Sequence, residues 1–210
     1  MKKGELFHSF VNSFLKISLL FMIVISFLNE RFIPAFLVVL NLAIVLIPSF
    51  FRMVWKIKIP LFADTVLSFI FFWQSIGTTW AYANIFWWDE IAHTVDLFLA
   101  NIAIFMVVIA LNDIKKIRVS LKFATIFVIC FGITLGVLFE IIEFLGDIFI
   151  FIPYRELPAQ QEGLYDTMKD LIFNVFSSSF GAIVGYNLFK NKKSWFISSI
   201  NEFKEVFKRK

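Results

Sequence analysis

The chain has 210 residues, of which 60% are hydrophobic and only 17% are charged, and its mean hydropathy is +0.82. This composition excludes an ordinary soluble domain and is typical of a polytopic membrane protein. The net charge of +4 comes from basic residues in short segments beside apolar runs, so we expect no nucleic-acid binding.

Six apolar segments are each long enough to cross a membrane as a helix of about 20 residues. They comprise residues 10–28, 32–51, 59–81, 85–111, 121–145 and 164–189. We therefore predict an all-α fold, a polytopic transmembrane helix bundle of about six spans that occupies residues 1–189. The one long connection contains the apolar stretch 148–152, which is too short to span and which we expect at the membrane interface.

Lysine and arginine are concentrated in alternate connections. The N-terminal segment, residues 52–58, residues 112–122 and the segment after residue 189 are basic, whereas the other connections carry only Arg31 and Arg155. Basic loops are retained on the cytoplasmic side of a membrane. We therefore predict that both termini are cytoplasmic and that this is a multi-pass protein of the plasma or inner membrane.

Residues 190–210 form a basic tail after the last span. Phe196, Ile200, Phe203 and Phe207 lie at positions i, i+4, i+7 and i+11, a spacing that predicts an amphipathic helix. We expect this helix to lie on the anionic inner leaflet, with a solvated charged tail as the alternative.

The fourth span carries several ionisable residues within about three turns of its outer end. Asp89, His93 and Asp96 share one helix face, and Glu90 reaches the same edge. An ionisable residue at such a depth in a membrane indicates a functional site.

Two later spans carry polar residues at the same depth. The fifth has Glu140 and Glu143 one turn apart, near Gly136, which allows a neighbouring helix to approach. The sixth has a polar stripe with a lysine beside it: Asp166, Asp170, Asn174 and Ser177, with Lys169 adjacent. We predict that the three helices bring these side chains together in one chamber near the outer surface.

Such a cluster would cost several kcal/mol per buried charge unless something neutralises it. Carboxylates with one imidazole suit Mg²⁺, Mn²⁺ or Fe²⁺ better than a structural zinc ion. The leading hypothesis is a divalent metal site whose ligands are Asp89, His93, Glu140, Glu143 and Asp170. The alternatives are a metal-free network of shared protons, and ion pairs that only pack the helices. Arg155 folding back from the long connection is a further source of positive charge.

Three motifs carry a resemblance to a known family. They are Asp89-Glu-Ile-Ala-His93, Gly136-Val-Leu-Phe-Glu140-Ile-Ile-Glu143, and Asp166-x-x-x-Asp170-x-x-x-Asn174 leading to Gly181-x-x-x-Gly185. Together they resemble the YjdF-type family of uncharacterised inner-membrane proteins, and more distantly they are similar to VanZ-like proteins. The resemblance covers roughly residues 85 to 186. The VanZ-like part of it implies a role in the cell envelope, without an established reaction.

These observations lead to three functional hypotheses. In the first, an outer-leaflet site binds a divalent cation and acts on a lipid or a lipid-linked envelope component. Its candidate catalytic residues are Asp89, Glu90, His93, Glu140, Glu143, Asp166 and Asp170, and its candidate substrate contacts are Arg155, Lys169 and Asn174. The second is a cation- or proton-coupled transporter. Such a transporter needs a path through the whole membrane, and Asp64 is the only candidate for the half of the path on the cytoplasmic side. We expect Asp64 near water at the cytoplasmic end of the third span. The third is a non-catalytic envelope scaffold, so the sequence leaves open whether the protein is an enzyme.

Overall fold

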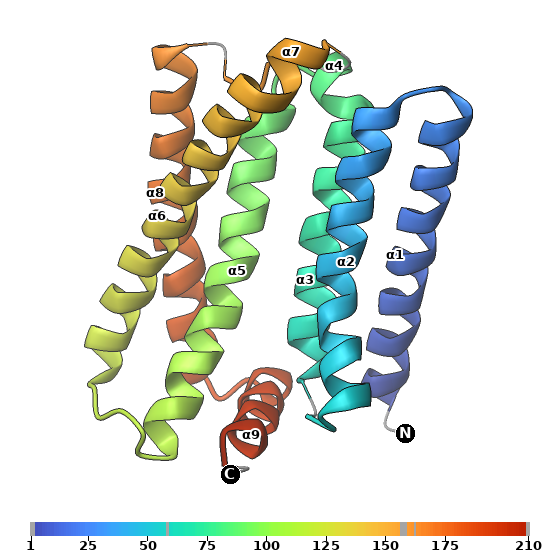
Figure 1. Ribbon diagram of the computed structural model, residues 1–210. Coiled ribbons are helices and arrows are strands. Elements are labelled where there is room, and N and C mark those ends of the chain that lie inside the picture. The colour runs from blue at the N-terminus through green and yellow to red at the C-terminus, as the bar shows by residue number, and fades with distance from the viewer. Residues whose placement is uncertain (1–2, 58, 156–158, 162, 209–210) are drawn as a thin grey trace.

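Long helices run side by side to form a bundle, and one further helix crosses an end of it (Figure 1). The structure is a computed structural model that describes residues 3–57, 59–155, 159–161 and 163–208. The principal helices are α1 (Lys3–Leu28), α2 (Phe32–Val54), α3 (Leu61–Ile76), α5 (Trp88–Asp113), α6 (Leu121–Gly146), α8 (Leu164–Lys190) and α9 (Ser194–Lys208). The described residues contain no β-strand, so the predicted all-α fold is confirmed.

Six helical segments among the described residues are long and apolar enough to cross a membrane. They are Leu6–Leu28, Phe32–Val54, Leu61–Asn84, Trp88–Asp113, Leu121–Tyr154 and Leu164–Lys190. Their order confirms the six predicted spans. Large apolar side chains such as Phe21, Phe36 and Phe180 are exposed on the outside of the bundle, as lipid-facing side chains are. The protein is therefore membrane-embedded.

Two spans continue beyond their regular α-helix through a π-helical turn. α3 continues through η1 (Gly77–Ala81) into α4 (Tyr82–Asn84), and α6 continues through η2 (Asp147–Phe151) into α7 (Ile152–Tyr154). The apolar stretch 148–152 is thus helical and continuous with the fifth span rather than a separate segment, and its place at the membrane interface stays a prediction. The helix continues because no proline interrupts it before Pro153.

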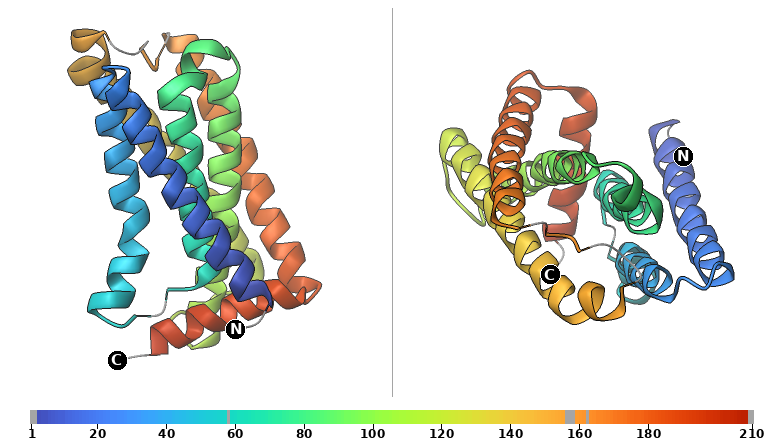
Figure 2. Two further views of the ribbon diagram at one scale, coloured as in Figure 1. Left: turned by 90° about the vertical axis from the view of Figure 1, so that its right-hand side faces the viewer. Right: turned by 90° about the horizontal axis from the view of Figure 1, so that it is seen from above.

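The spans form two groups of three, which Figures 1 and 2 show side by side. α1, α2 and α3 pack against one another, and so do α5, α6 and α8, while α3 also contacts α5 and joins the groups. Leu19, Val38 and Val45 form the core of the first group. The core of the second group includes Phe105 and Val128.

Glycines allow the second group to pack closely. A Cβ atom added at Gly181 of α8 would lie 2.7 Å from the backbone oxygen of Phe98 in α5. One added at Gly136 of α6 would lie 2.7 Å from Cγ of Asn174 in α8. Both separations are shorter than van der Waals contact, so these helices approach as they do because the side chain is absent. This confirms the role expected of Gly136.

α9 crosses the end of the bundle at which both termini lie (Figure 2). It contains the predicted amphipathic pattern, although residues 209–210 of the predicted tail lie outside the described residues. Phe196, Ile200 and Phe203 are buried in the core of the second helix group. Their face is therefore covered by protein, which corrects the expectation that it contacts the inner leaflet. An ion pair of 2.5 Å between Lys204 and Asp113 also ties α9 to α5.

Candidate functional site

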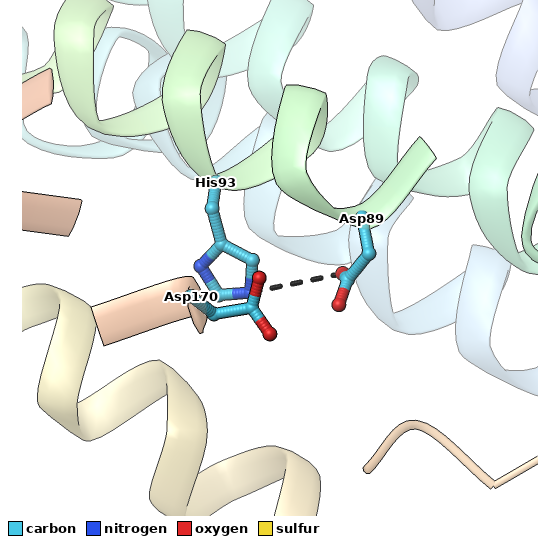
Figure 3. Close-up of side chains that lie close together, drawn as sticks. All are labelled: Asp89, His93 and Asp170. Atoms are coloured by element: carbon cyan, nitrogen blue, oxygen red, sulfur yellow. Dashed lines mark ion pairs between the residues drawn. The ribbon is translucent and has the colours of Figure 1, made fainter. Parts of the chain in front are cut away.

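The structure brings together all five predicted metal ligands, at the end of the bundle opposite α9. Two overlapping groups have ligand atoms that all lie within 4.8 Å of one another: Asp89, His93 and Asp170, and His93, Glu140 and Glu143. Figure 3 shows how α5 and α8 present the first group. Three helices that are separate in the sequence thus supply one cluster, as their shared depth predicts.

His93 lies at the centre of this His93 cluster. Its Nε2 atom is 3.5 Å from Oε1 of Glu140, 3.5 Å from Oε1 of Glu143 and 3.7 Å from Oδ1 of Asp89. These separations exceed those of good direct hydrogen bonds, which are about 3 Å. Two ligand atoms that are each about 2.1 Å from one cation lie roughly 3.0 Å apart at the right angle of an octahedral site and roughly 3.4 Å apart at a tetrahedral angle. The separations around Nε2 are slightly longer than this range, so a small divalent cation fits between these atoms after a small inward movement of the side chains.

Asn174 of α8 holds the other side of the imidazole ring. Nδ1 of His93 lies 3.1 Å from Oδ1 of Asn174. With its proton on Nδ1, the ring donates to this amide oxygen and presents the lone pair of Nε2 to the carboxylates. A hydrogen bond of this kind fixes the tautomer and orientation of metal-binding histidines. The structure therefore places Asn174 behind the ring, in a supporting position.

Buried oxygen atoms of the cluster lack donors. Asp170 is 1% exposed and Glu140 is 5% exposed. Oδ1 of Asp170 and Oε1 of Glu140 have no hydrogen-bond partner among the described residues. A buried polar atom without a partner costs roughly 1–3 kcal/mol, and more when it is charged. Because four carboxylates meet one imidazole in the two groups, the negative charge of the cluster must be offset by a bound cation or by protons that the carboxylates share.

Two residues that the sequence analysis missed hold Glu140 in place. Asp147 of η2 is buried and accepts hydrogen bonds from the backbone N–H of Gln160 at 2.7 Å and of Gln161 at 2.9 Å. The side-chain amide of Gln161 donates to the carbonyl oxygen of Glu140 at 3.1 Å and to its Oε2 at 3.2 Å. The available signal was the position of Asp147, four residues after Glu143 on the same helix face.

Glu90 and Asp166 lie beside the cluster and pair with Lys169. Nζ of Lys169 is 2.8 Å from Oε1 of Glu90 and 2.8 Å from Oδ1 of Asp166. Since two carboxylates already neutralise this ammonium group, it serves first as their counter-ion. Arg155 is exposed and does not line the pocket beside the cluster.

That pocket has a volume of about 500 Å³ and opens between α5, α8 and the connection before α8. Asp89, Glu90, Asp166 and Lys169 are among the residues that line it. Asp89 belongs to the His93 cluster as well. A molecule in the pocket can therefore approach a cation held by the cluster.

Two other acids of the spans lie outside the cluster. Asp96 accepts a hydrogen bond of 2.7 Å from Gln74 of α3, although it is buried on the same helix as His93. Asp64 is at the opposite end of the bundle, where it is buried and pairs with Arg52 and with Lys16. The expectation that Asp64 lies near water is wrong, because cations from α1 and α2 make its burial possible.

Six membrane spans, three of which supply a buried histidine–carboxylate cluster, define a helical integral membrane protein with a polar site inside the bundle. The family model described as predicted membrane protein (DUF2238) matches residues 11–191, and the chain therefore belongs to this family. The YjdF-type resemblance is thereby confirmed, since that type is this family. Neither the curated proteins nor the solved structures include a significant match to the chain.

Proposed function

We propose that the His93 cluster binds one divalent cation and that the protein uses this ion on a lipid or a lipid-linked component of the cell envelope. The observation that carries the proposal is Oδ1 of Asp170, which is buried without a partner in the group formed with Asp89 and His93. An oxygen-rich ligand set with a single imidazole favours Mg²⁺, Mn²⁺ or Fe²⁺ over a structural zinc ion.

The pocket supports a role for the ion beyond packing. Asp89 borders both the cluster and the pocket, so a substrate oxygen there can reach the ion, which would polarise it as a Lewis acid. Glu90 and Asp166 line the same pocket and are the candidates to accept or donate a proton. We propose the envelope as the setting from the resemblance of the sequence motifs to VanZ-like proteins.

We also propose that the cluster lies toward the exterior of a plasma or inner membrane. Lys56, Arg118 and Lys193 belong to connections at the end of the bundle where both termini lie. Basic connections remain in the cytoplasm, which supports cytoplasmic termini and an exterior site.

Transport of the cation has less support. Beyond the cluster, the core of α5, α6 and α8 contains fully buried Phe105, Met106 and Ala182. A charge cannot cross such an apolar layer without losing its hydration. Asp64, the candidate for a second half of a path, is occupied by its own cationic partners.

Elemental analysis of detergent-purified protein tests the proposal. After loading with Mn²⁺ and desalting, we expect about one ion per wild-type chain. Asp170→Asn should lose most of the ion, whereas the control Asp113→Asn, which removes an acid at the other end of α5, should keep it. Wild-type protein without a bound cation, or Asp170→Asn protein with a full complement, would exclude the metal site. In that case the cluster would be either a metal-free network of shared protons or a set of ion pairs that only pack the helices.

A further inference from the structure

Aromatic rings as well as acids line the pocket beside the His93 cluster. The rings and carboxylates are those of Tyr82, Phe86, Tyr165, Asp89, Glu90 and Asp166. Lys169 is the one cationic side chain among the described residues that line it, and it already bridges Glu90 and Asp166. An anionic pocket with several aromatic faces favours an organic ammonium group, which is attracted to both.

Parts of this lining remain available to a ligand. Phe86 is 91% exposed and Tyr165 is 85% exposed, so their ring faces are largely uncovered. Oε2 of Glu90 is buried and has no hydrogen-bond partner among the described residues. Asp89 lines the pocket and is also grouped with Asp170, which lies outside the lining, is 1% exposed and has an unpartnered oxygen. The pocket thus combines open aromatic surface with one carboxylate, Glu90, that has an unmet hydrogen-bond acceptor.

An apolar groove of about 500 Å³ adjoins the pocket. It is lined by Trp87 just before α5, by Ile91, Thr94 and Val95 of α5 and by Phe173 of α8, and Glu90 lines both the groove and the pocket. The distance along α5 from the first to the last of these residues is roughly 12 Å. The groove therefore has the length for part of one hydrocarbon chain, and it lies within a membrane span where lipid chains are the surrounding solvent.

We propose that the pocket and the groove together bind one amphiphilic lipid with an ammonium headgroup. Its ammonium lies among Glu90, Phe86 and Tyr165, and one of its hydrocarbon chains lies in the groove. The proposal rests on the proposed function, because it names the substrate class of the same site. Because Glu90 lines both the pocket and the groove, one molecule can occupy both with its headgroup and its chain. Because Asp89 lines the pocket and belongs to the His93 cluster, that molecule would lie beside the ion.

Native mass spectrometry of the purified protein tests the headgroup. The protein is titrated with phosphatidylethanolamine and with phosphatidylglycerol of identical chains. We expect at least about tenfold tighter binding of phosphatidylethanolamine, and a loss of about tenfold in Tyr165→Ala. Tyr154→Ala is the matched control, because Tyr154 is an exposed tyrosine at the same end that does not line the pocket. Equal or weaker binding of phosphatidylethanolamine, or an unchanged affinity in Tyr165→Ala, would overturn the proposal.

A substitution that fills the groove tests the chain. Thr94→Trp places a large ring between α5 and α8, and we expect it to weaken phosphatidylethanolamine binding about tenfold. Val175→Trp, at an exposed position of α8 outside the groove, should bind like the wild type. If both variants bind equally well, the groove is not the chain site. Mn²⁺ content is measured in the same preparations. If wild-type protein retains the ion but does not prefer phosphatidylethanolamine, only the lipid proposal is refuted. If wild-type protein contains no ion, the proposed function is refuted.

Discussion

Replacing Gly136 by alanine perturbs the metal site through helix packing alone. The added Cβ atom would lie 2.7 Å from both Cγ and Nδ2 of Asn174. Non-bonded carbon atoms prefer separations of about 3.5–4 Å, so Asn174 must move by roughly 1 Å. It is fully buried, and its movement breaks the 3.1 Å hydrogen bond to Nδ1 of His93.

The expected loss of metal affinity follows from that hydrogen bond. Removing an outer partner of a metal-binding histidine weakens affinity about 10–100-fold, which corresponds to about 1.4–2.8 kcal/mol. The crowding itself costs about 1–3 kcal/mol of folding free energy. Gly136→Ala should therefore lower both thermal stability and Mn²⁺ affinity.

Calorimetric titration of Mn²⁺ into Gly136→Ala and Gly132→Ala separates the two effects. A Cβ atom at Gly132 would lie 2.2 Å from Nδ2 of Asn101, a buried amide that bonds to Leu97 rather than to His93. Gly132→Ala should thus lose stability while it keeps wild-type affinity. Equal Mn²⁺ affinities in the two variants would refute the reasoning.

Three further predictions concern other parts of the molecule. Asp64→Asn leaves two cationic partners uncompensated and should lower stability by about 3 kcal/mol, the low end for a buried pair because both cations are partly exposed. An unchanged midpoint of thermal unfolding would contradict this. Gln161→Ala should weaken Mn²⁺ binding about tenfold, because it removes the side-chain amide that holds the carboxylate of Glu140. Gln160→Ala keeps the backbone hydrogen bond to Asp147 and should bind Mn²⁺ like the wild type. Similar Mn²⁺ titration curves for the two variants would argue against a supporting role of Gln161. In a cysteine-free background, Tyr154→Cys should react with an impermeant thiol reagent in intact cells, because the proposed topology places it outside the cell. Lys193→Cys should react only after lysis, because it lies on the cytoplasmic side. The reverse pattern would show that the proposed topology is inverted.

The fold was predictable because a membrane requires long apolar helices, and these are visible as uninterrupted runs of sequence. The cluster was predictable for a related reason. Once the spans alternate in direction, Asp89, Glu140 and Asp170 must lie at similar depths. Chain order, helix length and loop charge thus determine which residues share a layer of the bundle.

Other features depend on helix rotation and on the partners that cover each face, which a single sequence does not show. The polar stripe of α8 does not indicate whether Asn174 lies behind His93 or faces the pocket. The amphipathic pattern of α9 does not indicate whether protein or lipid covers Phe196. The burial of Asp64 depends on cations from two other helices. The hydrogen bond from Gln161 to the carboxylate of Glu140 depends on the path of the connection between α7 and α8.

Pulsed electron paramagnetic resonance of bound Mn²⁺ measures directly whether an ion lies against Nε2 of His93. We predict a coupling to a directly coordinated histidine nitrogen in the wild-type protein and no such coupling in His93→Gln. The control His8→Gln, which changes the other histidine near Thr65 at the opposite end, should retain it. Bound Mn²⁺ without nitrogen coupling in the wild type, or coupling that persists in His93→Gln, would contradict a metal site centred on His93.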